Sequence, residues 1–326
     1  MQTQPILLTR EQVKSHFSRL GLGFFAMLAV SQLVGTALSV IVSMVAPALT
    51  QTGWFLWVAS YLPLYGLGFP VFLAITKGVP DTRANAGILE HRAIGIPGLL
   101  MLVAIGMGIV YPLNVFALML SNLVQQLTGV GITNTLETVV MSSDPFVNLF
   151  FAVIVAPVME EIIFRGMLYR KLAGFGGKMY VFFSAFMFAL YHVNVYQLAY
   201  AFVLGLVFAA LTWFTGTIKY SLFLHIALNL LGSGISPFLY AYASETAVYI
   251  YSYCLLGLVV LGIILGVVWV IRHHREIFFA PGFLMMEKKS DTVVNPGVML
   301  MLFLFAALML MTLLAPYITN LLGLGG

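Results

Sequence analysis

Residues 20 to 76 read LGLGFFAMLAVSQLVGTALSVIVSMVAPALTQTGWFLWVASYLPLYGLGFPVFLAIT, without a single Asp, Glu, Lys or Arg. The stretch is long enough for two helices that each cross a bilayer, at ~20 apolar residues per crossing. The whole chain of 326 residues is 61% hydrophobic and only 8% charged, whereas about a quarter of the residues of a soluble domain are charged. This composition excludes a soluble globular protein and indicates a multi-pass protein of the cell membrane.

The apolar runs predict an all-α transmembrane helical bundle. Lipid cannot hydrogen-bond the backbone, so a span must be a helix or part of a closed barrel, and long runs without two-residue alternation favour helices. Candidate spans lie at 21–48, 54–76, 95–120, 146–169, 179–195, 197–216, 218–240, 248–271 and 297–317. The runs at 179–195 and 197–216 are short, and either could be broken or re-entrant. We therefore expect about eight to nine spans.

Basic residues alternate between the connections of these spans. Lys and Arg occur in residues 10–19, 77–92, 170–178, 219 and 272–289, but not in 49–53, 121–145, 195–197 or 241–247. Because positively charged loops stay in the cytoplasm, we expect a cytoplasmic N-terminus. The same loops account for the net charge of +4, so no nucleic acid is needed to explain it.

The N-terminus and the single cysteine give two further expectations. Basic residues before the first apolar run are also typical of a signal peptide, but a run from 21 to 48 exceeds the roughly 7–15 residues of a signal-peptide core. We therefore expect a retained first span. Cys254 has no second cysteine to pair with, so intramolecular disulfides contribute nothing to stability.

One span carries two carboxylates in the segment PVMEEIIFR, Pro157–Arg165. Ionisable residues inside a membrane are costly and point to function. Adjacent helical residues project ~100° apart, so we expect that Glu160 and Glu161 do not face the same partner. Glu161 can pair with Arg165 at i, i+4, which leaves Glu160 free to face a cavity. A packing network of both glutamates with Arg165 is the alternative interpretation.

Two histidines lie in apolar segments, His192 in FALYH and His225 in LHIALN. The i, i+4 spacing should pack Phe188 against His192 and direct His225 and Asn229 into one space. At ~1.5 Å per residue, these polar groups and Glu160 lie roughly 10–20 Å from the cytoplasmic ends of their spans. A common pocket is therefore feasible. The remaining histidines are expected in solvated loops, namely His16, His91, His273 and His274.

The motifs EExxxR (Glu160, Glu161, Arg165), FxxxH (Phe188, His192) and HxxxN (His225, Asn229), in this order, resemble those of the CAAX protease and bacteriocin-processing (CPBP, or Abi) family. The resemblance covers about residues 150–235. It implies hydrolysis of a peptide bond within the membrane, with Glu160, His192, His225 and Asn229 in the site. The family includes type II CAAX prenyl endopeptidases, relatives implicated in bacteriocin immunity or peptide processing, and members thought to be scaffolds.

Within this resemblance the chain divides into N-terminal transmembrane helices and loops (1–145), a catalytic core (146–240) and C-terminal transmembrane helices (241–326). The expected partners are the lipid bilayer and a membrane-embedded or lipidated peptide or protein substrate. Prenylation of that substrate is not readable from the sequence.

Two mechanisms fit these residue types. In the first, Glu160 activates water, His192 positions that water or protonates the leaving amine, and His225 and Asn229 donate hydrogen bonds to the oxyanion. Glu161, Arg165 and Phe188 would support these groups. In the second mechanism, a zinc ion is held by Glu160, His192 and His225, as in a metalloprotease, although the sequence lacks HExxH. We favour the metal-free mechanism.

Two other classes of function remain open. A proton-coupled transporter also uses intramembrane Glu and His, but broken helices in symmetric repeats are expected there, and the sequence has no convincing repeat. A catalytically silent scaffold or bacteriocin-immunity protein on the same fold would be indicated by loss of a motif residue, and every one is present.

Overall fold

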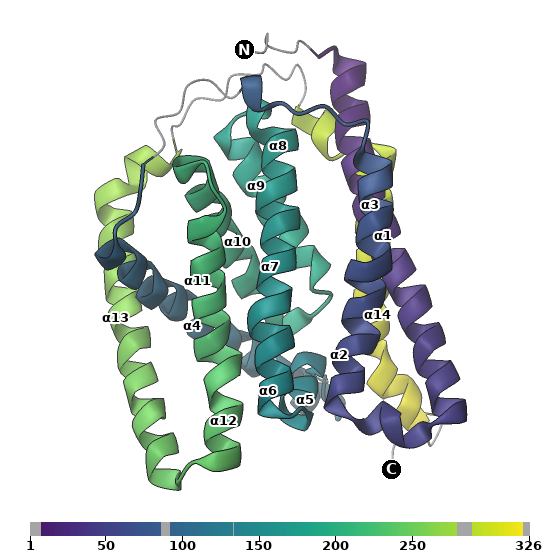
Figure 1. Cartoon of the computed structure of the whole chain (residues 1–326), viewed down its shortest axis with the longest axis vertical. Helices are drawn as coiled ribbons and strands as arrows, with labels where there is room; N and C mark the ends of the chain where they lie inside the picture. Colours follow the sequence, from purple (N-terminus) through teal and green to yellow (C-terminus); the bar gives the residue numbers. More distant parts are fainter. Residues whose placement is uncertain (1–7, 86–91, 133, 279–288, 322–326) are drawn as a thin grey trace.

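The computed structural model describes residues 8–85, 92–132, 134–278 and 289–321 (Figure 1). These residues form helices and their connections, with no strand among them, so the predicted all-α bundle is confirmed. The helices are α1 (Arg10–Val45), α2 (Gly53–Tyr61), α3 (Phe69–Thr76), α4 (Ile96–Thr128), α5 (Thr135–Ser142), α6 (Pro145–Asn148), α7 (Ala156–Glu160), α8 (Leu168–Leu172), α9 (Gly177–Tyr191), α10 (Val195–Thr215), α11 (Lys219–Asn229), α12 (Ile235–Tyr242), α13 (Glu245–Phe278) and α14 (Pro296–Leu321).

Several of these helices continue into one another through π-helical turns. Such turns at Leu62–Gly68, Leu149–Val155, Glu161–Met167 and Leu230–Gly234 join α2 to α3, α6 through α7 to α8, and α11 to α12. The described part of the chain then contains eight helices long and apolar enough to cross a membrane. The chain is therefore a multi-pass integral membrane protein.

The predicted span 179–195 corresponds to α9, which is not among these eight: it has 15 residues and is roughly 22 Å long at ~1.5 Å per residue. The prediction that this run is short is correct, but the helix ends at Tyr191, before His192. A break in 197–216 is not found, because α10 runs continuously from Val195 to Thr215.

Successive crossings bring the basic connections to one end of the bundle. Figure 1 shows the start of α1, the end of α3 and the turn between α8 and α9 at the top, while α14 ends at the bottom. This arrangement has the alternation that the sequence predicts. The cytoplasmic location of this end stays a prediction from the positive charge of its connections.

Close helix crossings depend on glycines. A Cβ atom on Gly262 of α13 would lie 1.8 Å from the Ala104 carbonyl oxygen of α4, and one on Gly297 of α14 would lie 1.7 Å from the Ser18 carbonyl oxygen of α1. Small residues allow such backbone approach between membrane helices. Gly262 therefore packs within this chain, against α4.

The prediction for His16 is wrong. This histidine is 3% exposed, and its ring lies against Phe17 and Phe175 with centroids 5.7 and 5.0 Å away. Helix α1 begins at Arg10, earlier than the apolar run suggests, and the i, i+3, i+4 spacing of Val13, His16 and Phe17 places them on one buried face.

The prediction of loops is also wrong for His273 and His274, whose backbone lies in α13. His273 is half-buried on α13, where it stacks on Trp269 at 5.4 Å. His91 and the side chain of His274 lie outside the described residues.

Candidate active site

The structure brings the four predicted site residues to one cavity of about 300 Å³. Glu160 is the last residue of α7, His192 follows the last turn of α9, and His225 and Asn229 lie on α11. Glu160 and His225 are buried, at 8% and 5% exposure. Residues that are far apart in the sequence thus present a carboxylate, two imidazoles and an amide to one small space.

Local sequence explains how α7 reaches this position. Asp144 accepts hydrogen bonds from the backbone amides of Phe146 and Val147, 2.8 and 3.4 Å away, and Pro145 occupies the first helical position. Both features favour helix initiation. The helix then passes through two π-helical turns that flank α7, and turns of this kind are frequent at functional sites.

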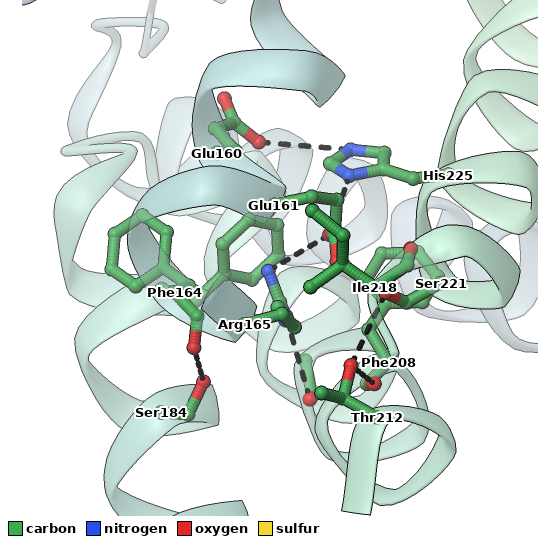
Figure 2. A network of polar contacts seen from close by, with 12 residues as sticks. Glu160, Glu161, Phe164, Arg165, Ser184, Phe208, Thr212, Ile218, Ser221 and His225 are labelled. Atoms are coloured by element: carbon green, nitrogen blue, oxygen red, sulfur yellow. Dashed lines mark hydrogen bonds and ion pairs between the residues drawn. The ribbon is translucent and has the colours of Figure 1, made fainter. Parts of the chain in front are cut away.

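His225 lies between the two adjacent glutamates (Figure 2). Its Nδ1 is 3.0 Å from Glu161 Oε1, and its Nε2 is 3.6 Å from Glu160 Oε2. The prediction that the two carboxylates do not face the same partner is therefore wrong. Their divergent directions are compatible with one imidazole, because its two nitrogens offer separate contacts.

Glu161 also forms the predicted ion pair with Arg165. Arg165 Nη1 lies 3.1 Å from Glu161 Oε1, and both side chains are fully buried. The guanidinium carbon is 4.1 Å from the centre of the Phe188 ring and 5.1 Å from that of Phe208, and Nη2 donates to the Gly205 carbonyl at 3.4 Å. A carboxylate and aromatic faces therefore compensate this buried cation.

The alternative of a single packing network describes only half of the motif. Glu161 and Arg165 form such a network, whereas Glu160 lines the cavity and contacts His225.

Phe188 orients His192 as the spacing predicts. The two rings meet edge to face with centroids 4.8 Å apart, and His192 Nδ1 lies 2.7 Å from the Phe188 carbonyl oxygen. A carbonyl only accepts, so Nδ1 carries the proton and Nε2 is the nitrogen left for other partners. The next residue, Val193, has φ of +44°, a strained conformation for a β-branched residue.

Asn229 is fixed through one of its amide hydrogens. Its Nδ2 donates to the carbonyl of Ala152, 2.8 Å away in the first π-helical turn. The second amide hydrogen and Oδ1 remain for other contacts. Asn229 therefore has a defined orientation at the cavity that the sequence does not predict.

Several cavity residues are missed by the sequence analysis. Phe208 stacks on His225 with ring centroids 4.8 Å apart, and the cavity is also lined by Tyr61, Tyr65 and Tyr191. The i, i+4 spacing of Tyr61 and Tyr65, inside an apolar run, is a signal that could have identified these two. Phe208 has no such signal, because a phenylalanine in α10 is ordinary for a membrane helix.

The residues proposed as zinc ligands do not fit that role in this arrangement. In the described part of the chain, no three His, Cys, Asp or Glu side chains form a group that could hold a metal ion, and Glu160, His192 and His225 are among those tested. We derive no step through zinc.

Comparison with known families identifies the segment that carries the site. Residues 142–231 match the family model of the type II CAAX prenyl endopeptidases, Rce1-like. Neither the curated proteins nor the solved structures give a significant match. The matched segment contains all three motifs, and the resemblance to the CAAX protease and bacteriocin-processing family of intramembrane proteases is thereby confirmed for residues 142–231.

Proposed function

We propose that the protein is an intramembrane endopeptidase in which Glu160 activates water to attack a peptide bond. The family match supports a CAAX-type intramembrane endopeptidase at the family level. The observation that carries the residue assignment is the separation of 3.6 Å between Glu160 Oε2 and His225 Nε2 on the cavity wall. It exceeds a direct hydrogen bond, and one oxygen atom can lie within hydrogen-bond distance of both groups.

The support behind His225 favours one orientation of its ring. Glu161 accepts from Nδ1–H at 3.0 Å and is itself held by Arg165. Nε2 is therefore directed toward Glu160, and Phe208 stacked on the ring restricts its tilt. When Nε2 also carries a proton, His225 donates to the oxyanion that forms as water attacks.

Glu160 is the group best suited to take the proton of the attacking water. Of the two adjacent carboxylates, Glu161 is engaged with Arg165 and His225, whereas Glu160 lines the cavity. A general base must lie within hydrogen-bond reach of the proton that it abstracts. Glu160 can then pass this proton toward the leaving amine.

His192 and Asn229 complete the proposed chemistry. With Nδ1–H donated to Phe188, His192 offers Nε2 to the water or the leaving amine. Asn229 retains one amide hydrogen for the oxyanion while the other is held by Ala152. A membrane-associated peptide or protein is the substrate class that suits a site within the spans.

Glu160→Gln tests the assignment with little change in volume. We expect cleavage of quenched membrane peptides to fall by at least ~100-fold, the lower range for loss of a general base, with an unchanged melting temperature. Glu137→Gln on α5, an exposed glutamate, is the matched control and should retain activity. Activity should survive a zinc chelator. Retained cleavage by Glu160→Gln, or chelator-induced loss that added zinc restores, would overturn the proposed mechanism.

A further inference from the structure

A second cavity, of about 730 Å³, adjoins the candidate active site. We call it the α1–α2 groove. It lies between the C-terminal half of α1, from Leu28 to Ser43, and the segment from Phe55 to Leu64. Tyr61, Tyr191 and His192 line both cavities, so the groove is continuous with the space in front of the proposed catalytic residues.

The groove has an unusual lining for a membrane protein. One face of α1 presents Ser31, Gln32, Thr36, Ser39 and Ser43 to it, opposite apolar side chains such as Phe55, Leu56 and Leu64, and no Asp, Glu, Lys or Arg lines it. Within the described part of the chain, the side chains of Gln32, Thr36 and Ser39 make no hydrogen bond. An amide or hydroxyl facing hydrocarbon without a partner is costly. The lining therefore suits a ligand that brings its own hydrogen-bonding groups.

Tyr191 gives an independent indication of a ligand at the inner end of the groove. Its side chain is 6% exposed, and its hydroxyl is buried without a hydrogen-bond partner among the described residues. Such a group costs about 1–3 kcal/mol when it stays unpaired. Tyr191 lines both cavities beside His192, so this unmet donor and acceptor belongs to the wall where the two cavities join.

We propose that the α1–α2 groove binds an uncharged, extended segment of the substrate peptide, leading one side of the scissile bond to Glu160. This inference rests on the proposed protease function. A peptide bond must leave a membrane helix before it can be attacked, and its freed N–H and C=O groups then need partners that lipid cannot provide. The α1 hydroxyls, Gln32 and Tyr191 provide them.

The polar face on α1 favours a peptide over an isoprenoid or acyl chain, and the apolar wall that includes Phe55, Leu56 and Leu64 can pack against the side chains of that peptide. A hydrocarbon chain would leave the hydroxyls and the amide unpaired, at the cost just described. A charged peptide segment would enter a groove without a counter-charge, which is also unfavourable. The preferred segment is therefore rich in small or polar uncharged residues. It approaches from the end of α1 that lies opposite the basic connections.

The test uses two readouts on the full-length protein in lipid nanodiscs. The probe is a synthetic membrane peptide of ~20 residues, rich in Leu and Ala, with a central Gly-Ser pair, a photoreactive leucine and a quenched fluorophore. Cross-linking mapped by mass spectrometry reports binding, and fluorescence reports cleavage. Ser39→Leu introduces a larger side chain into the groove. Ala37→Leu is the matched control, because Ala37 is exposed on α1 and does not line the groove.

We expect Ser39→Leu to weaken peptide binding about tenfold. Cross-linking to α1 should therefore fall at least ~10-fold, and KM should rise by a similar factor. Ala37→Leu should change neither quantity. Tyr191→Phe should raise KM about 3–10-fold, the range of one hydrogen bond, while the melting temperature stays constant or rises because an unpaired hydroxyl is removed. A purely structural role for this hydroxyl would give the opposite change in melting temperature.

Four results would overturn the groove proposal. Two concern the peptide probe: equal cross-linking in Ser39→Leu and wild type, or cross-links confined to other surfaces. The third is a fall in the melting temperature of Tyr191→Phe. The fourth is labelling of the groove by a photoreactive farnesyl cysteine that the peptide does not displace. Cross-linking in the groove without any cleavage would instead refute the protease function and leave the peptide site standing.

Discussion

Replacing Glu161 by glutamine isolates the energy of the buried charge network. In the wild type, Glu161 Oε1 lies 3.0 Å from His225 Nδ1 and 3.1 Å from Arg165 Nη1. Glutamine keeps an oxygen that can accept from His225 but removes the negative charge that faces Arg165. Arg165 is fully buried, so solvent cannot take over the role of its partner. Removing one partner of such a pair costs about 3–5 kcal/mol.

The lower end of this range is expected for Glu161→Gln. The retained hydrogen bond to His225 preserves about 1 kcal/mol, and the Phe188 and Phe208 rings still face the guanidinium. A loss of about 3 kcal/mol, at roughly 2 °C per kcal/mol for a chain of this size, lowers the melting temperature by roughly 6 °C.

A double-mutant cycle separates this effect from general damage. Arg165→Met removes the buried cation and fills most of its volume, and replacing both partners of a buried pair by neutral groups is often nearly neutral. Glu161→Gln combined with Arg165→Met should therefore melt above Glu161→Gln alone, with a coupling energy of at least ~2 kcal/mol. Thermal unfolding of the four proteins in one detergent provides the measurement. Additive changes in melting temperature would refute an energetic coupling between Glu161 and Arg165.

Two further changes test the packing that holds the site. Gly262→Ala places a Cβ atom 1.8 Å from the Ala104 carbonyl, so α4 and α13 must separate and the melting temperature should fall by several degrees. Gly257→Ala on the same helix, where a Cβ meets nothing within 4 Å, should be neutral, and equal effects would contradict the close crossing. Phe208→Leu should lower kcat about tenfold by releasing the His225 ring, at a cost of about 1–2 kcal/mol of stability. Phe214→Leu, at an exposed position of α10, should leave kcat unchanged.

Most of the fold follows from hydropathy and charge alone. Unbroken apolar runs predict which segments form the spans, because in lipid a helix must be both long and apolar. The bounds are less well predicted, since α1 begins at Arg10 rather than 21 and α4 ends at Thr128 rather than 120. The predictions fail where apolar character and helical structure diverge. His16 precedes the charge-free run but lies inside α1, and α5 forms within the polar connection 121–145 that hydropathy treats as a loop.

The sequence predicts which residues belong to the candidate site, but not which contacts they make with one another. Spacing identifies Glu160, His192, His225 and Asn229 because each is polar in an apolar segment, and i, i+4 spacing finds the partner of Arg165. It cannot determine which helices meet. The contact of His225 with both glutamates depends on the approach of α11 to α7, and the π-helical turns beside α7 alter the angular spacing that the prediction assumes.

The polar groups on the two sides of His225 differ in how they are paired. Behind His225, the charges of Glu161 and Arg165 offset each other, and aromatic rings cover both the cation and the imidazole. In front of it, the Tyr191 hydroxyl has no partner among the described residues, and His225 Nε2 stands beyond hydrogen-bond distance from Glu160. Arg165 Nε is also buried without a hydrogen bond among the described residues, so the side behind His225 is balanced in charge rather than fully hydrogen-bonded. On the other side, we expect a substrate to supply the missing partners. If the site acts as proposed, we expect it to bind the polar atoms of a peptide more strongly than lipid, because only the peptide removes the cost of the unpaired groups.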